Sequence, residues 1–486
     1  MRRSGNGHGI ALERVRSGQL VTEERFSYYA LPGIDESRLF KRPIALQFHY
    51  DGHLYRVDGE RSGGIFELFL DLLYVGIVAN FARNVTEFPD GIHILKYIII
   101  FLHAYQIWHD LRELFNQYYT DDLGQRALVL AVMAAMVAFA NNAVYIGEEM
   151  DGEPALITAL VAYIIAHCLC VAVFLIYSVF VPEHAIQIRA VAFTHIFTVG
   201  IRVAIPFVSW GGRIAICWVA IACERLSWLY FYSPWFKRHA KLTFSTAVNI
   251  SHEVDRMTAL FIIVLGAFLS AIVVGSPAGI GATSGLARAI LILVCAFCLN
   301  WMYSRGDGAY HFTHAIRRRV WSAFLWFFIH EPLSASLILA GDISSSLTLH
   351  EDPKIEHKWI FAASLCIGLL CMWVLALLNE CHDQLVWRKP VRMAVRPLVA
   401  VIIVFLPLAD LNATNFLGVC AGLLVFTLVW ETYGALDYET ERQRSNSCPA
   451  PPPEERDASI NGVREVVGEK DENVPPDAAP ACVTMA

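Results

Sequence analysis

Long apolar segments alternate with short polar ones through most of this 486-residue chain. Twelve of the apolar segments come close to the length of about 20 residues that a helix needs to cross a bilayer. They lie at about residues 65–82, 94–109, 126–146, 155–180, 190–209, 214–232, 258–275, 287–304, 320–340, 359–379, 397–411 and 414–434. This pattern predicts an all-α fold, a polytopic bundle of about twelve membrane-spanning helices.

The two ends of the chain differ from the part between them. Residues 1–62 are polar and contain no apolar run that could form the core of a signal peptide, so we expect the first spanning helix to direct insertion. The C-terminal end is rich in Pro, Asp and Glu and poor in large apolar side chains, which is typical of disorder. We therefore predict a polar N-terminal segment (1–62), a transmembrane helical domain (63–434) and a disordered tail (435–486).

Composition and charge agree with a membrane protein. The chain is 56% hydrophobic and 17% charged, whereas soluble domains have about 25% charged residues. If the N-terminus is cytosolic, the inner loops hold fifteen Lys and Arg residues and the outer loops hold four, as the positive-inside rule predicts. The inner residues are Arg112, Arg126, Arg189, Lys237, Arg238, Lys241, Arg256, Arg305, Arg317, Arg318, Arg319, Arg388, Lys389, Arg392 and Arg396. We expect both termini to be cytosolic, the bilayer to surround the protein and no nucleic acid to bind it; the membrane and the oligomeric state stay open.

The two halves of the chain show a weak similarity. ELFLDLLYVG at residues 67–76 aligns with ALFIIVLGAF at residues 259–268, an offset of 192, and the loops after Trp108 and Trp301 have equal spans. Six helices in each half would make the repeats parallel, related by an axis along the membrane normal. Short apolar matches also arise by chance, so a parallel 6+6 repeat and an unrelated pair of halves are both open.

Two carboxylates, Glu67 and Asp71, lie inside the first apolar segment. Four residues make about one helical turn, so both acids are expected on one face. A charge within the bilayer is costly, and such acids normally face a partner, a cavity or water. We predict that Arg256, at the start of the seventh segment, is the counter-charge for both acids, with Asp255 turned toward the cytosol. In the alternative, one acid reaches the headgroups and the other holds a neighbouring helix.

Other polar residues within the apolar segments are further candidates for an ion or substrate pathway. Arg202 and Glu224 lie on consecutive segments joined by a short turn, and we predict that they form an ion pair. His330 and Glu331 precede Pro332, where neighbouring polar groups are needed to satisfy the carbonyls that a proline frees. The alternative for these residues is a purely structural role.

Several polar residues are weaker candidates. Asp121 and Asp122 fall in an inner loop, where a solvated surface is the simpler interpretation, and His103 lies in the second segment. A single histidine within a spanning helix, such as His167 or His195, is more often a hydrogen-bond partner between helices than a ligand. We assign no catalytic residue, no metal site and no cofactor from the sequence.

Three stretches carry a resemblance to a known family. GIFELFLDLLYVGIVANFA resembles the first-helix signature of the low-temperature-requirement A (LtrA) family, and Trp108 with NQYYTDDLGQRALVL (Asn116–Leu130) resembles its second signature. HEVDRMTALFIIVLG (His252–Gly266) resembles the third, in which an acid-Arg pair leads into an apolar helix. The resemblance implies a many-helix membrane protein without a defined molecular activity. The family usually has an acid directly after this Leu-Gly step, where this chain has Ala267.

Three classes of function fit these features. Enzyme motifs are lacking: the sequence has no Walker loop, no dinucleotide-binding glycine pattern and no HExxH. Twelve spanning segments with acids inside the membrane favour a transporter or channel for a small solute or ion. The alternatives are an intramembrane enzyme that acts on a lipid and a scaffold or sensor whose buried charges only fix the packing of helices. The sequence identifies neither a substrate nor a direction of transport.

Overall fold

The computed structural model describes most of the chain between residues 26 and 436. The described ranges are 26–29, 39–50, 53–57, 64–118, 120–147, 152–306, 308, 312–382 and 385–436. The predicted C-terminal tail lies outside the described residues from position 437 onward, and so does most of the predicted N-terminal segment.

Each of the twelve predicted segments forms a helix, which confirms the all-α polytopic bundle. Eleven helical stretches are long and apolar enough to cross a membrane. The twelfth helix, α2, is equally long at 28 residues and carries more charge. The long helices are α1 (Ile65–Glu87), α2 (Gly91–Tyr118), α3 (Leu123–Ala143), α4 (Gly152–Phe180), α5 (Ala185–Arg202), α6 (Trp210–Phe231), α8 (Ile250–Val273), α9 (Ser284–Arg305), α11 (Val320–Leu349), α12 (Ile355–Leu378), α14 (Val395–Phe405) and α15 (Ala413–Gly434).

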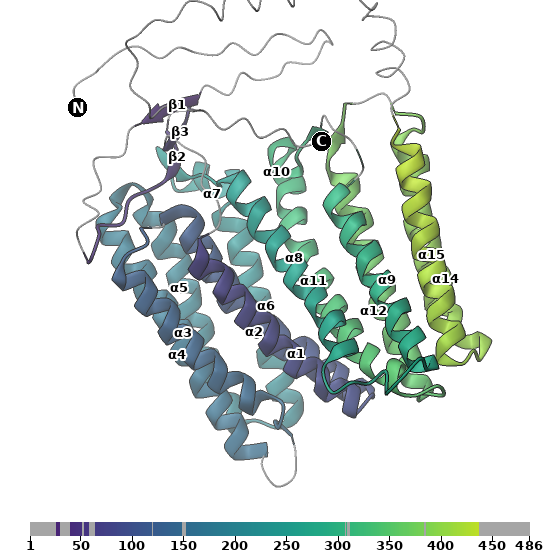
Figure 1. Ribbon diagram of the computed structural model, residues 1–486. Helices are drawn as coiled ribbons and strands as arrows, with labels where there is room; N and C mark the ends of the chain where they lie inside the picture. The colour runs from purple at the N-terminus through teal and green to yellow at the C-terminus, as the bar shows by residue number, and fades with distance from the viewer. Residues whose placement is uncertain are drawn as a thin grey trace, which may run out of the picture.

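Short elements connect the long helices. They are α7 (Pro234–His239), α10 (Ala315–Arg318), α13 (Lys389–Met393) and the 3₁₀ turns at Pro182–His184, Ile205–Phe207 and Leu406–Ala409. Four strands, β1 (Phe26–Tyr29), β2 (Gln47–Tyr50), β3 (His53–Val57) and β4 (Phe244–Thr246), form one small sheet in the order β1-β3-β2-β4. A second pair joins β5 (Phe312–Thr313) to β6 (Glu380–Cys381). The sequence analysis did not predict these strands. Pairing of β2 with β4 holds the N-terminal segment against the loop before α8 (Figure 1).

The helices of the two halves have corresponding neighbours. In the first half α1 contacts α2 and α3, α3 contacts α4, α4 contacts α5, and α5 contacts α6. In the second half α8 contacts α9 and α11, α11 contacts α12, α12 contacts α14, and α14 contacts α15. Figure 1 shows α3 and α4 on one side of the bundle and α9, α14 and α15 on the other, with α1 and α8 between them. A parallel 6+6 repeat would produce this order of neighbours, and the repeat itself stays a prediction.

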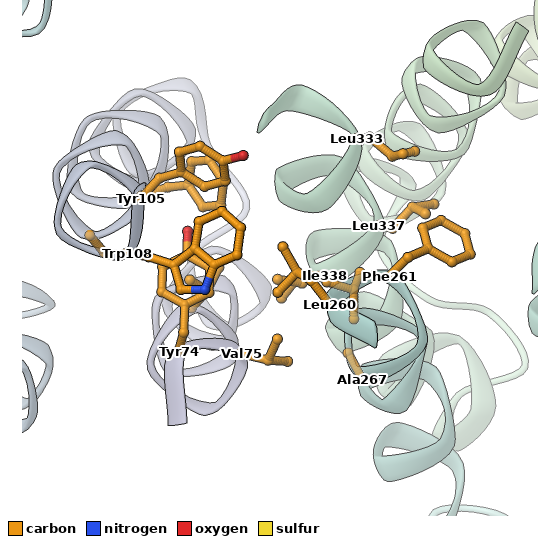
Figure 2. Close-up of a cluster of buried hydrophobic side chains, with 14 of the residues drawn as sticks. Tyr74, Val75, Tyr105, Trp108, Leu260, Phe261, Ala267, Leu333, Leu337 and Ile338 are labelled. Carbon is orange, nitrogen blue, oxygen red and sulfur yellow. The ribbon is translucent and has the colours of Figure 1, made fainter. Parts of the chain in front are cut away.

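The two halves meet where α1 and α2 face α8 and α11. Figure 2 shows Tyr74 and Trp108 on one side of this interface and Leu260 and Leu337 on the other. All four side chains are buried, and the rings of Tyr74 and Trp108 lie 5.9 Å apart. The polar residues described below are therefore held by a packed apolar core, which fixes their positions.

Helices α8 and α11 approach each other closely at a pair of small residues. A Cβ atom on Gly341 would lie 2.8 Å from the Ala267 Cβ and 2.9 Å from the Phe268 backbone nitrogen. The small side chain of Ala267 thus lies directly against a glycine. A larger residue at either position would push the two helices apart.

Four of the fifteen basic residues predicted in inner loops are instead buried in the bundle: Arg112, Arg256, Arg392 and Arg396. Arg112 lies within α2, which continues to Tyr118 instead of ending near residue 109. The loop assignment is wrong for Arg112, Arg256 and Arg396, which lie on the long helices α2, α8 and α14, whereas Arg392 lies on the short connecting helix α13. Arg112, Arg256 and Arg396 have acidic partners inside the bundle, which compensate the cost of burying their charges.

Candidate functional site

Helix α2 is the element around which the buried polar residues gather. Every residue from His103 to Tyr118 is buried, including those on what would be the polar face of a surface helix. Its first turn is capped by Asp90, whose carboxylate accepts hydrogen bonds from the backbone N–H groups of Ile92 and His93 at 2.9 Å. A helix surrounded on all sides has to satisfy its charged side chains with those of its neighbours.

The first group is the acid–arginine cluster of Glu67, Asp71, His252 and Arg256, all fully buried. The Arg256 guanidinium donates from Nη1 to Glu67 at 2.5 Å and from Nη2 to Asp71 at 2.6 Å. His252 Nε2 lies 2.8 Å from Glu67, and Trp108 Nε1 donates to Asp71 at 2.7 Å. The predicted pairing of Arg256 with both acids is confirmed.

Asp255 does not join this cluster. Its side chain is exposed, as expected for a residue turned away from the acid face. The buried acid of this turn is Glu253, which lies 3.3 Å from Arg112 of α2. The Arg112 guanidinium also lies 4.8 Å from the centre of the Phe327 ring, a cation–π contact.

A second buried pair joins α5 to α6. Arg202 forms two hydrogen bonds to Glu224, at 2.6 and 2.9 Å, which confirms the predicted ion pair. The Thr198 hydroxyl donates to the same carboxylate at 2.6 Å. A bidentate pair with a further donor holds the Glu224 carboxylate in one orientation.

The two residues before Pro332, His330 and Glu331, contact different parts of the bundle. Glu331 pairs with Arg225, which also donates to Gln106 of α2. His330 is turned elsewhere, with its two ring nitrogens on the Trp326 carbonyl at 2.6 Å and the Tyr303 hydroxyl at 3.0 Å. The structure therefore connects Glu331 to the polar residues of α2 and leaves His330 beside α9.

The secondary candidates lie in two separate places, the start of α3 and the middle of α2. Asp122 caps α3 by accepting from the Gln125 N–H at 2.9 Å, and half-exposed Asp121 pairs with Arg126 at 3.0 Å. His103 is buried, with its Nδ1 2.8 Å from the Ile99 carbonyl and its ring against Tyr163. Asp121 therefore forms a surface ion pair, and Asp122 caps the start of a helix.

The sequence analysis missed Asp110 and treated His167 and His195 only as single residues. His167 Nε2 and His195 Nδ1 lie 2.7 Å apart, the expected hydrogen bond between helices. Asp110 of α2 approaches both rings, at 3.7 Å from His167 and 3.6 Å from His195. The signal was present in the sequence as the run His109-Asp110-Leu111-Arg112-Glu113, but the charges indicated the end of a spanning helix.

These three residues form the one group of metal-ligand type found in the part of the chain that the structure describes. One ligand atom from each of Asp110, His167 and His195 lies within 4.8 Å of the others, and all three residues are buried. The side chains come from α2, α4 and α5. No spacing within a single segment could have shown this arrangement, because it depends on how the three helices pack.

A pocket of about 100 Å³ lies between α2, α3, α4, α5 and α6 and reaches Arg202. Its lining is mostly aliphatic and aromatic, with Lys96, His103, Tyr163 and Arg213 as further polar or charged residues. A space of this size holds a few water molecules or a small ion.

Comparison with known proteins identifies the family. The family model described as "Bacterial low temperature requirement A protein (LtrA)" matches residues 64–430, from the start of α1 to the last turn of α15. A search of curated proteins found no match, and neither did a search of solved structures. Since the family model covers most of the chain, including α1, α2 and α8 with their signatures, this protein belongs to the LtrA family.

Proposed function

We propose that this protein is a transporter or channel for a small ion or solute. The observation that carries the proposal is a continuous series of polar side chains that leads from the pocket at Arg202 along α2. From Arg202 the series runs through Glu224, His167, Asp110, His109 and Glu113 to Gln117, with no step longer than 4.0 Å. We call these seven residues the polar path.

The polar path is long compared with the bilayer. Its end on α2, Gln117, lies fourteen residues after His103, which lines the pocket. At 1.5 Å of rise per residue this separation is about 21 Å, against a hydrocarbon core of about 30 Å. A series of polar groups of this length supports passage of a hydrophilic species through the bundle better than a local structural role.

The charges along the path also favour transport over a scaffold. In a scaffold that needs only helix packing, buried charges are expected in compensated pairs such as Arg202–Glu224, because an uncompensated buried charge is destabilising. Asp110 differs, because no Lys or Arg nitrogen of the described residues lies within 4.0 Å of its carboxylate. A buried acid without a fixed counter-charge is costly, and a passing cation would supply the missing charge.

We propose the orientation in which both termini are cytosolic. An even number of crossings puts the start of α1 and the end of α15 at the same end of the bundle. The pocket would then lie toward the other side of the membrane, near Arg213 at the start of α6 and Glu153 at the start of α4, which pair at 2.8 Å. Gln117, at the end of α2, would lie toward the cytosol.

Flux measurements in liposomes that contain the full-length protein test this function. Gradients of H⁺, Na⁺, K⁺, Cl⁻, Mn²⁺ and Zn²⁺ would be imposed in turn and followed with dyes inside the vesicles. We expect at least one gradient to dissipate faster than in protein-free liposomes, and Glu224→Gln to slow that flux.

Asp121→Asn is the matched control, because it also removes an acid, but the half-exposed Asp121 pairs with Arg126 and is not one of the seven residues of the path. Its flux should equal that of the wild type. If all six gradients persist as long as in protein-free liposomes, or if both variants slow the flux equally, the proposed pathway is wrong.

A further inference from the structure

We infer that Asp110, His167 and His195 bind a divalent transition-metal ion of the Zn²⁺ type. The proposal starts from position: three potential ligands from three different helices converge in the buried middle of the first half of the bundle. Each of the three side chains is at most 5% exposed. A chance cluster of polar side chains is expected at the surface, where water satisfies it, and not here.

The ligand types define the class of ion. Two imidazoles and one carboxylate are a common set for Zn²⁺ and for other first-row divalent metals, whereas Ca²⁺ and Mg²⁺ prefer oxygen ligands alone. No cysteine belongs to the group, so a soft monovalent ion such as Cu⁺ is a poorer match.

The distances between the ligands are close to those of a filled site. Bonds of about 2.1 Å in a tetrahedral arrangement place the ligand atoms about 3.4 Å apart. The carboxylate oxygens of Asp110 lie 3.7 Å from His167 Nε2 and 3.6 Å from His195 Nε2. The two imidazoles are nearer, at 2.7 Å, because they share a hydrogen bond. Metal binding would replace this hydrogen bond and would draw together one ligand atom of each residue, which lie within 4.8 Å of one another.

An unused carboxylate oxygen points to a missing partner. Asp110 Oδ2 is buried and has no hydrogen-bond partner among the described residues. The other Asp110 oxygen accepts a hydrogen bond from Gln106 at 2.7 Å, which orients the carboxylate and leaves Oδ2 available. Gln106 is itself held by a hydrogen bond from Arg225. A ligand oriented by outer hydrogen bonds, with one lone pair left over, is typical of metal sites.

Charge balance supports the same conclusion. Glu224 lies 4.0 Å from His167, but its charge is already compensated by Arg202. Among the described residues, the basic side chains within 4.0 Å of the Asp110 carboxylate are histidines, and a metal ion would supply the positive charge that this acid lacks. Since Glu224 is engaged with Arg202 and Thr198, the protein offers three ligands and a fourth position stays open. Open positions are typical of metal sites that exchange or activate a ligand.

Metal binding at this site does not require transport, because a resident ion and a transported ion would use the same ligands. If the proposed function is correct, two of the three ligands, Asp110 and His167, lie on the polar path, and the site favours a divalent metal as the transported species. If the protein transports nothing, the ion would hold α2, α4 and α5 together. Binding is therefore measured at equilibrium in detergent, where the result does not depend on flux.

The experiment uses the full-length protein, stripped with a chelator and titrated with Zn²⁺ or Co²⁺ alone. We expect one ion per chain, a rise in melting temperature on binding and, for Co²⁺, the strong visible absorption of a low-symmetry site with nitrogen ligands. The variants His167→Ala, His195→Ala and Asp110→Asn should each weaken binding by more than about 100-fold, since even outer-sphere changes cost 10- to 100-fold.

His103→Ala is the matched control. His103 is also buried in this half of the bundle and packs edge-to-face with Tyr163, as His167 does, but it is not one of the three ligands. It should bind the metal as the wild type does. Wild-type protein that binds neither ion, or binding that is equal in all four variants, would overturn the proposal. The Co²⁺ spectrum of the wild type decides the matter even if a variant does not fold, because a spectrum of hydrated Co²⁺ alone means that no site exists.

Discussion

Arg256 Nη2 and Asp71 Oδ1 lie 2.6 Å apart, although the two residues are 185 positions apart in the chain. The same guanidinium reaches Glu67, so one cation from α8 holds both acids of α1. Trp108 of α2 donates to the Asp71 oxygen that Arg256 also contacts. The start of α8 is therefore fixed to α1 and α2 by charge in addition to apolar packing.

Removing Arg256 should destabilise the protein strongly. In Arg256→Gln two buried carboxylates lose their counter-charge, and breaking a buried pair costs about 3 to 5 kcal/mol. Adding Asp71→Asn should recover part of this loss, with a coupling energy above about 1 kcal/mol in a double-mutant cycle. Thermal unfolding in detergent measures both effects.

Asp255→Asn controls for a change of charge in the same turn of α8, because this side chain is exposed. Its melting temperature should stay at the wild-type value. Strictly additive losses in the cycle would show that Arg256 and Asp71 do not interact energetically.

The close contact of α8 with α11 should make Gly341 intolerant of a side chain. In Gly341→Ala the new methyl group would meet Ala267 and the Phe268 backbone, and such overpacking costs about 1 to 3 kcal/mol. Gly266→Ala is the control in the facing helix, where a Cβ meets nothing within 4 Å. Equal unfolding temperatures for the two variants would contradict the close packing.

Replacing Arg396 by lysine should lower the stability of the protein. Its guanidinium forms two hydrogen bonds to Glu431 of α15, at 2.6 and 2.7 Å, and donates to the carbonyls of Met372 and Gly306 at 2.8 Å. A lysine keeps the charge but not the planar fork, so Arg396→Lys should lose at least about 1.5 to 3 kcal/mol, the worth of one charge-assisted hydrogen bond. Arg318→Lys, at a half-exposed pair with Glu380, should show no measurable loss.

The cap of α2 should depend on pH. Hydrogen bonds from the backbone N–H and the side chain of His93 and from the Ile92 N–H hold the pKa of Asp90 below its ordinary value. A lowered pKa in the folded state means that the ionised cap contributes stability above the ordinary pKa of about 3.9, and that this contribution is lost as the pH falls through the folded value.

Asp90→Ala should cost about 1 kcal/mol at neutral pH, as for other helix caps. Asp90→Asn keeps a capping oxygen without the charge, so its stability difference from the wild type should shrink toward pH 3. A difference that does not change with pH would show that the charge of Asp90 contributes nothing to the cap.

The orientation is tested by labelling single cysteines in a cysteine-free background in intact cells. Arg238 and Asp352 are both exposed, and they lie between α6 and α8 and between α11 and α12, respectively. In the proposed orientation an impermeant reagent should label Asp352→Cys and not Arg238→Cys until the cells are opened. The reverse pattern would place both termini outside the cytosol.

Much of the architecture could be predicted because hydrophobic length determines spanning helices directly. All twelve segments are helical, and the ion pairs of Arg256 with α1 and of Arg202 with Glu224 were predicted from charges that need partners inside a bilayer. The extent of α2 was not predicted. Its last turns mix apolar residues with Asp110, Arg112 and Glu113, a pattern that a loop entering water would share.

The candidate metal ligands could not be predicted for a different reason. His167 and His195 lie on separate helices, and each looks like an ordinary polar residue in its own segment. Only the packing of α2, α4 and α5 brings them to Asp110. Sequence alone gives the residues on each helix, but not the angle at which three helices present them to one another.

The complete burial of α2 from His103 to Tyr118 has a consequence for how the protein is made. Several of the side chains that pair with α2 are synthesised later, among them Arg225, Glu253 and Trp228. When α2 leaves the ribosome, its Gln106, Arg112 and Glu113 still lack these partners, and lipid cannot replace them. The helix therefore has to be retained by the insertion machinery or at the membrane surface until α6 and α8 have been made, so that biogenesis of the first half waits for the second.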